Sequence, residues 1–158
     1  MACRNTHERY GSVTKFFHWL IFVLFLIQII VGVSMSRIGN EIIQGRFYTF
    51  HKSVGLLILF VMILFIFWSL INPKPHWSIS MTKWERVAAK TVHFALYLLL
   101  FLMPISGWLL STAAGHPPNF FWLVEIPMPG IGINKAVVTA AANIHLILAW
   151  VTSVSRCS

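Results

Sequence analysis

The chain has 158 residues, of which 58% are hydrophobic and only 10% are charged. A soluble domain is about half apolar and about a quarter charged, so this chain has too few charged residues to cover a surface that faces water. The composition excludes a disordered chain and a collagen-like fibre, and it argues against a soluble globular protein. The net charge of +8 could indicate nucleic-acid binding, but the basic residues first have to be located along the chain.

Four apolar segments predict four membrane-spanning helices, since a helix needs about 20 mostly apolar residues to cross the hydrocarbon core. In chain order they cover about residues 16–36, 47–71, 88–111 and 136–154. The second ends at Asn72 and Pro73, a good stop signal, the third contains Pro104, and the fourth is the least hydrophobic. The sequence therefore predicts an all-α fold, a transmembrane four-helix bundle that forms one membrane domain over residues 1–158.

The basic residues outside these segments predict how the chain is oriented. Eight fall on one side of the membrane: Arg4, Arg9, Lys15, Lys74, Lys83, Arg86, Lys90 and Arg156. Four fall on the other side: Arg37, Arg46, Lys52 and Lys135. Because basic loops favour the cytoplasm, we expect both termini there, which explains most of the net charge without nucleic acid. The long outer loop, residues 116–135, is expected to contain a surface turn or a short helix.

Each predicted span holds one histidine, and the four alternate between two depths. His18 and His93 lie toward the cytoplasmic ends of their spans, whereas His51 and His145 lie toward the outer ends. A single histidine near a membrane interface is more often a satisfied polar group than a ligand, but four ionisable side chains arranged in this way indicate a functional site. The other three histidines, His7, His76 and His116, fall in tails or loops.

Several kinds of site use histidines at these depths. A zinc site needs further ligands at the same depth, and the one acidic candidate, Glu125, lies in a loop. A proton relay needs Asp or Glu within the spans, and the sequence has none there. A haem with two axial imidazoles needs only one neutral histidine on each of two facing helices. Cys3 and Cys157 form no CxxCH motif, which excludes a covalent c-type haem.

Small residues near the histidines predict room for a flat macrocycle. Gly55 lies one turn beyond His51, and alanines flank His145. Gly32 and Gly107 each follow a histidine of their own span by 14 residues, which places them on the same helix face at the opposite depth. Ordinary close packing of helices explains any single glycine as well, so it is the repetition that favours a cofactor.

The order of these residues resembles the bacterial cytochrome b561 family. The matching motifs are His18-Trp19, Phe50-His51-Lys52-Ser53-Val54-Gly55 and His93…Tyr97…Pro104…Gly107. The resemblance extends from about Tyr10 to Val151, and the family is similar in architecture to the cytochrome b subunit of nickel–iron hydrogenases. It implies four transmembrane helices in the bacterial inner membrane, two haem b groups stacked across the bilayer and electron transport in a respiratory chain.

The resemblance also implies partners for the electrons. Members pass them between a quinone, such as ubiquinone, and a donor that is either superoxide or a partner oxidoreductase. A chain that acts alone would be an oxidoreductase of the superoxide:ubiquinone type, and otherwise it would be an electron carrier. The alternatives are a haem-binding membrane anchor for a dehydrogenase or hydrogenase, and a truncated copy with only one haem site.

The family pattern assigns axial ligands of the haem iron to positions in this chain. His51 and His145 match the ligands of the outer haem, and His18 matches one ligand of the inner haem. The other inner ligand would fall at position 159, so we expect a member truncated at its C-terminus whose inner site lacks that ligand. His93, at the depth of His18, is a candidate replacement, or else it contacts a quinone or a haem propionate together with Lys90.

Basic residues near both haem depths have two interpretations. Lys52 and Arg46 lie on the outer side, where they can steer an anion or pair with propionates. They can equally anchor the chain at the membrane interface. Lys90 on the cytoplasmic side is interpreted first as a snorkelling anchor of this kind.

Overall fold

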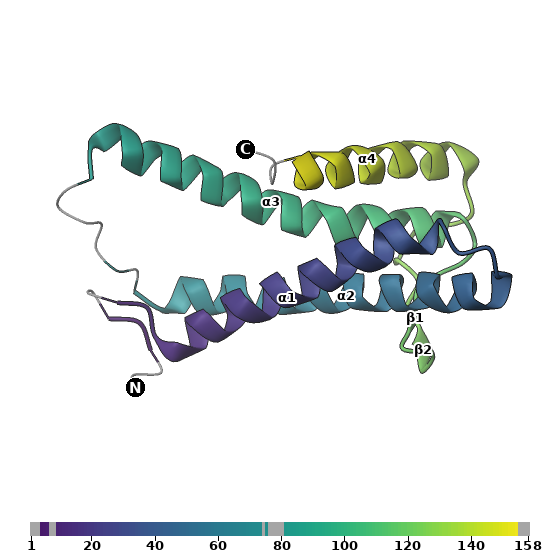
Figure 1. Cartoon of the computed structure of the whole chain (residues 1–158), viewed down its shortest axis with the longest axis horizontal. Coiled ribbons are helices and arrows are strands. Elements are labelled where there is room, and N and C mark those ends of the chain that lie inside the picture. The colour runs from purple at the N-terminus through teal and green to yellow at the C-terminus, as the bar shows by residue number, and fades with distance from the viewer. Residues whose placement is uncertain (1–3, 7–8, 74, 76–80, 155–158) are drawn as a thin grey trace.

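A computed structural model describes residues 4–6, 9–73, 75 and 81–154, without the side chains of 152–154. Its helices are α1 (Ser12–Met35), α2 (Glu41–Ile71), α3 (Lys83–Ala113) and α4 (Lys135–Val154), and its strands are β1 (Asn119–Phe120) and β2 (Val124–Glu125) (Figure 1). The prediction of an all-helical fold with four helices is confirmed apart from this short hairpin. Helices α1, α2 and α3 are long and apolar enough to cross a membrane, whereas α4 is a shorter apolar helix over Lys135–Val151.

Capping residues, not hydropathy, fix where the helices begin. Helix α2 starts at Glu41, before the predicted apolar segment, because the Asn40 side chain accepts hydrogen bonds from the N–H groups of Ile42 and Ile43. Helix α3 starts at Lys83 because Thr82 and Glu85 form a reciprocal capping box. Hydropathy locates the part of a helix that lies in hydrocarbon, and the capped ends extend beyond it.

The four helices form a row of sequence neighbours. Helix α1 packs on α2, α2 on α3, and α3 on α4, while within the described residues the backbone of α1 does not come close to the backbone of α3 or α4. The predicted bundle is therefore not closed all round. Figure 1 shows the α1–α2 pair and the α3–α4 pair close together near the connections 36–40 and 114–134 and apart at the end of α2 and the beginning of α3.

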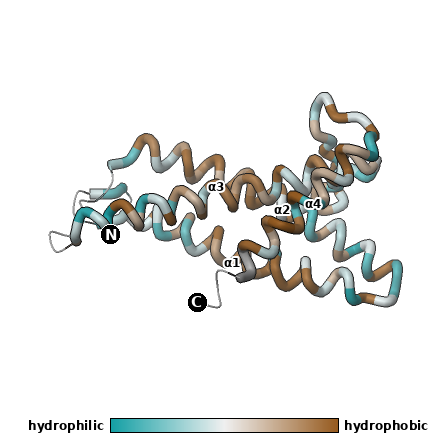
Figure 2. Tube along the Cα trace, turned by 90° about the horizontal axis from the view of Figure 1, so that it is seen from above, coloured by the Kyte–Doolittle hydropathy of each residue, from teal (hydrophilic) through white to brown (hydrophobic). Residues whose placement is uncertain are grey.

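The most buried apolar cluster lies between α1 and α2. It contains Ile21, Val54, Ile58, Val61, Met62 and Phe65. Large apolar side chains are exposed along all four helices, among them Phe60 and Phe94. Figure 2 shows hydrophobic residues along most of the helices and hydrophilic residues mainly at loops and helix ends. Such an apolar exterior suits lipid rather than water.

The loop between α3 and α4 folds back onto the helices. Within it β1 and β2 pair antiparallel, so the predicted surface turn is a short hairpin, and the alternative of a short helix is wrong. The Ser53 hydroxyl donates to the Asn119 carbonyl at 2.9 Å and accepts the N–H of Phe121 at 2.8 Å. The indole N–H of Trp108 donates to the Ile126 carbonyl at 2.8 Å. These contacts hold the loop against α2 and α3.

The opposite end of the molecule is tied together by a buried asparagine. The side chain of Asn5 donates to the Pro73 carbonyl at 3.0 Å, beyond the end of α2. Its oxygen accepts from the Gly11 N–H at 2.9 Å and from the Thr14 hydroxyl at 2.7 Å. Asn5 thereby supplies a cap for α1 in place of Gly11, which has no side chain to do so.

Candidate functional site

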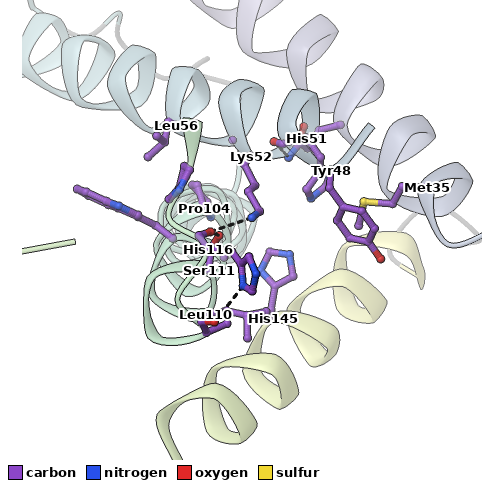
Figure 3. Close-up of a pocket in the computed structure, with 16 residues that line it drawn as sticks. Met35, Tyr48, His51, Lys52, Leu56, Pro104, Leu110, Ser111, His116 and His145 are labelled. Carbon is purple, nitrogen blue, oxygen red and sulfur yellow. Dashed lines mark hydrogen bonds between the residues drawn. The ribbon is translucent and has the colours of Figure 1, made fainter. Parts of the chain in front are cut away.

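Two of the predicted histidines meet in the interior. His51 of α2 and His145 of α4 approach each other with ring centroids 6.4 Å apart and ring planes at 82° (Figure 3). The backbones of α2 and α4 make no contact within the described residues, so the two imidazoles reach across the space between the helices. This space belongs to a cavity of about 320 Å³ that both rings line, together with apolar side chains such as Leu56, Pro104 and Leu110.

Polar groups of α3 fix the tautomer of His145. Its Nδ1 lies 3.1 Å from the Met103 carbonyl oxygen and 2.9 Å from the Ser106 hydroxyl oxygen. A carbonyl only accepts, so Nδ1 carries the proton, and Ser106 turns its own proton to the same carbonyl at 2.7 Å. The Nε2 lone pair is then available to a metal, and this arrangement is typical of metal-binding histidines.

His51 has a different environment. Its Nδ1 is buried and has no hydrogen-bond partner in the described structure. Gln28 of α1 donates to the backbone carbonyl of His51 at 2.9 Å, and the Gln28 side-chain oxygen is likewise buried without a partner. A buried polar atom without a partner is costly, so this imidazole is incompletely satisfied by protein groups alone.

One glycine packs directly against each of the two rings. A Cβ added at Gly32 of α1 would lie 3.1 Å from Cε1 of His51, and one added at Gly107 of α3 would lie 3.0 Å from Cε1 of His145. The sequence predicts these glycines to make room for a macrocycle, and the structure shows that they make room for the imidazoles. Gly55, by contrast, lines the cavity itself.

A polar rim closes the cavity on the side of the α3–α4 loop. The Lys52 ammonium donates to the His116 carbonyl at 2.9 Å, and the Ser111 hydroxyl donates to the same oxygen (Figure 3). Lys52 and His116 both line the cavity, whereas Arg46 is exposed and is not among its lining residues. The sequence assigns no role to His116, because only the fold of the loop brings it to this place.

The structure does not bring the other two histidines together. His18 on α1 and His93 on α3 are both exposed, and the backbones of these two helices do not come close to each other within the described residues. Nδ1 of His93 bonds the carbonyl of Ala89 in its own helix at 2.7 Å, and Lys90 is exposed. Other residues used in the sequence predictions lie outside the described residues, namely Cys3, His7, Lys74, His76, Arg156 and Cys157.

The donor set at the cavity fits an iron macrocycle better than a compact metal site. The described residues contain no group of three or more His, Cys, Asp or Glu side chains able to hold a metal ion, which is what structural zinc requires. Two imidazoles line one cavity, one with its Nδ1 proton held by α3 and the other with a buried Nδ1 that has no partner in the described structure, and such a pair would suit the two nitrogen ligands of a haem iron.

Comparisons with known proteins agree with this chemistry. A family model described as prokaryotic cytochrome b561 matches residues 9–154. The cytochrome b561 homolog 2 of Escherichia coli (strain K12) is 34% identical over 153 residues, which cover 95% of this chain and 80% of that protein.

Proposed function

The chain belongs to the prokaryotic cytochrome b561 family of membrane b-type cytochromes, which bind haem b and transfer electrons, and we propose that it holds one haem b between His51 and His145. The observation that carries the proposal is the approach of these two rings across a cavity. Two further observations support it. Gly32 and Gly107 let the two rings lie directly against the neighbouring helices, and the buried Nδ1 of His51 has no partner among the described protein groups.

When bound, the haem supplies an iron that changes oxidation state by one electron. The residues of this chain have the remaining tasks. Met103 and Ser106 keep the proton of His145 on Nδ1, so that Nε2 faces its ligand with a lone pair. Leu56, Pro104 and Leu110 line the cavity with apolar surface, which limits the entry of water. This surface thereby keeps the local dielectric low, on which the reduction potential of the bound group depends.

Lys52 and His116 form the polar edge of the proposed site. Haem carries two carboxylates, and a lysine ammonium already held at the cavity rim can neutralise one of them. Lys52 therefore belongs to the binding site in this proposal, in preference to the alternative role of a simple interface anchor. Arg46 is exposed and remains available to attract an anion from solution.

The proposed partner for the electrons is a quinone, ubiquinone in particular, with superoxide or a partner oxidoreductase as donor. Two superoxide ions release two electrons as they become dioxygen, and these electrons with two protons convert ubiquinone to ubiquinol. At the His18 end, His93 and Lys90 are both exposed. The Lys90 ammonium offers a donor and a positive charge to a quinone oxygen, and His93, whose Nδ1 proton goes to Ala89, offers its Nε2 as an acceptor to a quinol hydroxyl. The proposal is confined to the His51–His145 site, because within the described residues the backbones of α1 and α3, which carry His18 and His93, do not come close to each other.

We place the protein in the bacterial inner membrane as a single membrane domain, with both termini in the cytoplasm. The bias of basic residues supports this orientation, with eight predicted on the cytoplasmic side and four on the outer side. The His51–His145 site then lies toward the outer surface. Reporter fusions at the two termini, compared with a fusion in the 114–134 loop, test the orientation.

The deciding experiment is a haem count and a redox titration of the full chain in lipid nanodiscs. One haem per chain, titrating as a single wave and reduced by ubiquinol or by superoxide, is the expected result. Reduction only after a partner subunit is added would favour the membrane-anchor function. Two haems would refute the single site, and a chain without haem would overturn the proposal as a whole.

A further inference from the structure

The hairpin between α3 and α4 presents a bare apolar tip. Its three consecutive residues Trp122, Leu123 and Val124, here called the hairpin tip, are 55%, 83% and 54% exposed. Residues 117–134 around it contain a single charged residue, Glu125. Loops in water are normally polar, so this loop lacks the composition of one that is surrounded by water.

The backbone directs the tip outward. Phe121 and Trp122 have φ angles of 46° and 62°, a left-handed conformation that side chains other than glycine rarely adopt. The bond from the Phe121 N–H to Ser53, and that from the Leu123 N–H to the Phe120 carbonyl at 2.9 Å, hold this conformation. The Phe121 ring consequently packs on Phe50, with centroids 6.2 Å apart, while the residues that follow it face away from the helices.

The anchor of the hairpin marks a definite depth along α2. Ser53 is fully buried and directly follows Lys52, the last charged residue of that helix. The uncharged segment from residue 53 to residue 71 is about 28 Å long at 1.5 Å per residue, close to the roughly 30 Å thickness of the hydrocarbon core. Ser53 therefore lies at one boundary of the hydrocarbon, and the hairpin projects beside α2 at that level (Figure 1).

We propose that the hairpin tip inserts into the interfacial layer of the bilayer, so that its partner is lipid and not protein. The tip carries no charge and projects beside α2, a helix with exposed apolar side chains of its own. It also contains a tryptophan, the residue enriched where hydrocarbon meets headgroups. The same loop supplies His116 and Pro118 to the cavity lining, so insertion of the tip attaches the cavity rim to the membrane surface.

The test is to measure depth with spin labels on the full chain in nanodiscs. Leu123→Cys is introduced with Cys3→Ser and Cys157→Ser, and the label is exposed either to oxygen, which concentrates in lipid, or to a water-soluble nickel chelate. Ile42→Cys is the matched control, since Ile42 is also exposed, at 73%, yet lies about 16 Å before Ser53 along α2. Phe60→Cys, 58% exposed on α2 within the apolar segment, gives the value for lipid.

The label at position 123 is expected to fall between the two references, with oxygen accessibility above that of the chelate but by a smaller factor than at position 60, whereas the label at position 42 shows the reverse. Equal behaviour at positions 123 and 42 would overturn the proposal by placing the tip in water. Protection of position 123 from both reagents would also overturn it, because protein would then cover the tip. The measurement does not involve haem, so it stands apart from the proposed electron transfer.

Discussion

At one end of the helix row His51 and His145 face each other across a cavity, each ring supported by a glycine of the neighbouring helix. At the other end His18 and His93 lie exposed on helices whose backbones do not come close to each other in the described structure. Both pairs of histidines stand at comparable depths in their helices. Histidine depth alone is thus a poor guide to ligation, and what distinguishes the two ends is whether neighbouring backbones come close enough to support a ring.

Removing an imidazole tests this contrast most severely. His145→Ala and His51→Ala are each expected to abolish haem binding at the cavity, because each leaves only one of the two imidazoles proposed to bind the iron and an empty space in place of the other ring. His18→Ala and His93→Ala should retain the full haem content. Absorption spectra of the purified variants measure this directly, and loss of haem in His18→Ala with retention in His145→Ala would reverse our assignment.

Filling the space beside a ring should have the next largest effect. Gly107→Ala and Gly32→Ala would each bring a methyl group to about 3 Å from an imidazole carbon, and overpacking of this kind typically costs about 1–3 kcal/mol. We expect haem content to fall several-fold and the thermal midpoint to drop. Gly45→Ala is the control: this exposed glycine of α2 has no atom within 4 Å of an added Cβ, and alanine favours a helix interior.

Ser106→Ala should act more mildly on the same site. It removes one of two groups that hold Nδ1 of His145 and leaves the Met103 carbonyl in place. Loss of such a supporting hydrogen bond typically weakens a metal site about tenfold or more, and we expect the lower end of that range together with a higher reduction potential. Competition for haem with an apoglobin and a potentiometric titration measure the two effects, and Ser106→Thr should restore both.

The smallest effect on the cavity is expected from a change at the opposite end. Asn5→Ala removes three hydrogen bonds that join the N-terminal segment to α1 and to the chain beyond α2, which should lower the free energy of unfolding by about 1–3 kcal/mol. The haem spectrum and potential should not move. A shifted spectrum in Asn5→Ala would mean that the two ends are coupled more tightly than their separate contacts indicate.

Much of the fold follows from composition, because runs of uncharged residues such as 53–71 have few structures open to them other than a helix in lipid. Hydropathy does not predict the first residues of α2 and α3, because Asn40 and Thr82 cap these helices through hydrogen bonds and not through hydrophobicity. The sequence does not predict the hairpin either, because strands of two residues are too short to show an alternation of apolar and polar residues.

The candidate site, like the fold, has a part that the sequence predicts and a part that it does not. The spacing and depth of the histidines predict His51 and His145 as a pair, and their ligand role stays a prediction. The support that Ser106 gives to His145, and the place of His116 at the rim, depend on how α3 meets α4 and how a loop folds back. Neither contact has a signal in the order of residues alone.

The row of helices has a consequence for how the protein is assembled. Within the described residues, every helix-to-helix contact joins neighbours in the sequence, so each helix can pack on the one just before it as it leaves the ribosome. The meeting of His51 and His145 is the exception, because it links helices that are not consecutive and whose backbones do not touch. If haem binds between these two rings as we propose, its insertion would be the late step that joins α4 to α2. A cell short of haem would then accumulate a chain with all its helices formed and without that link.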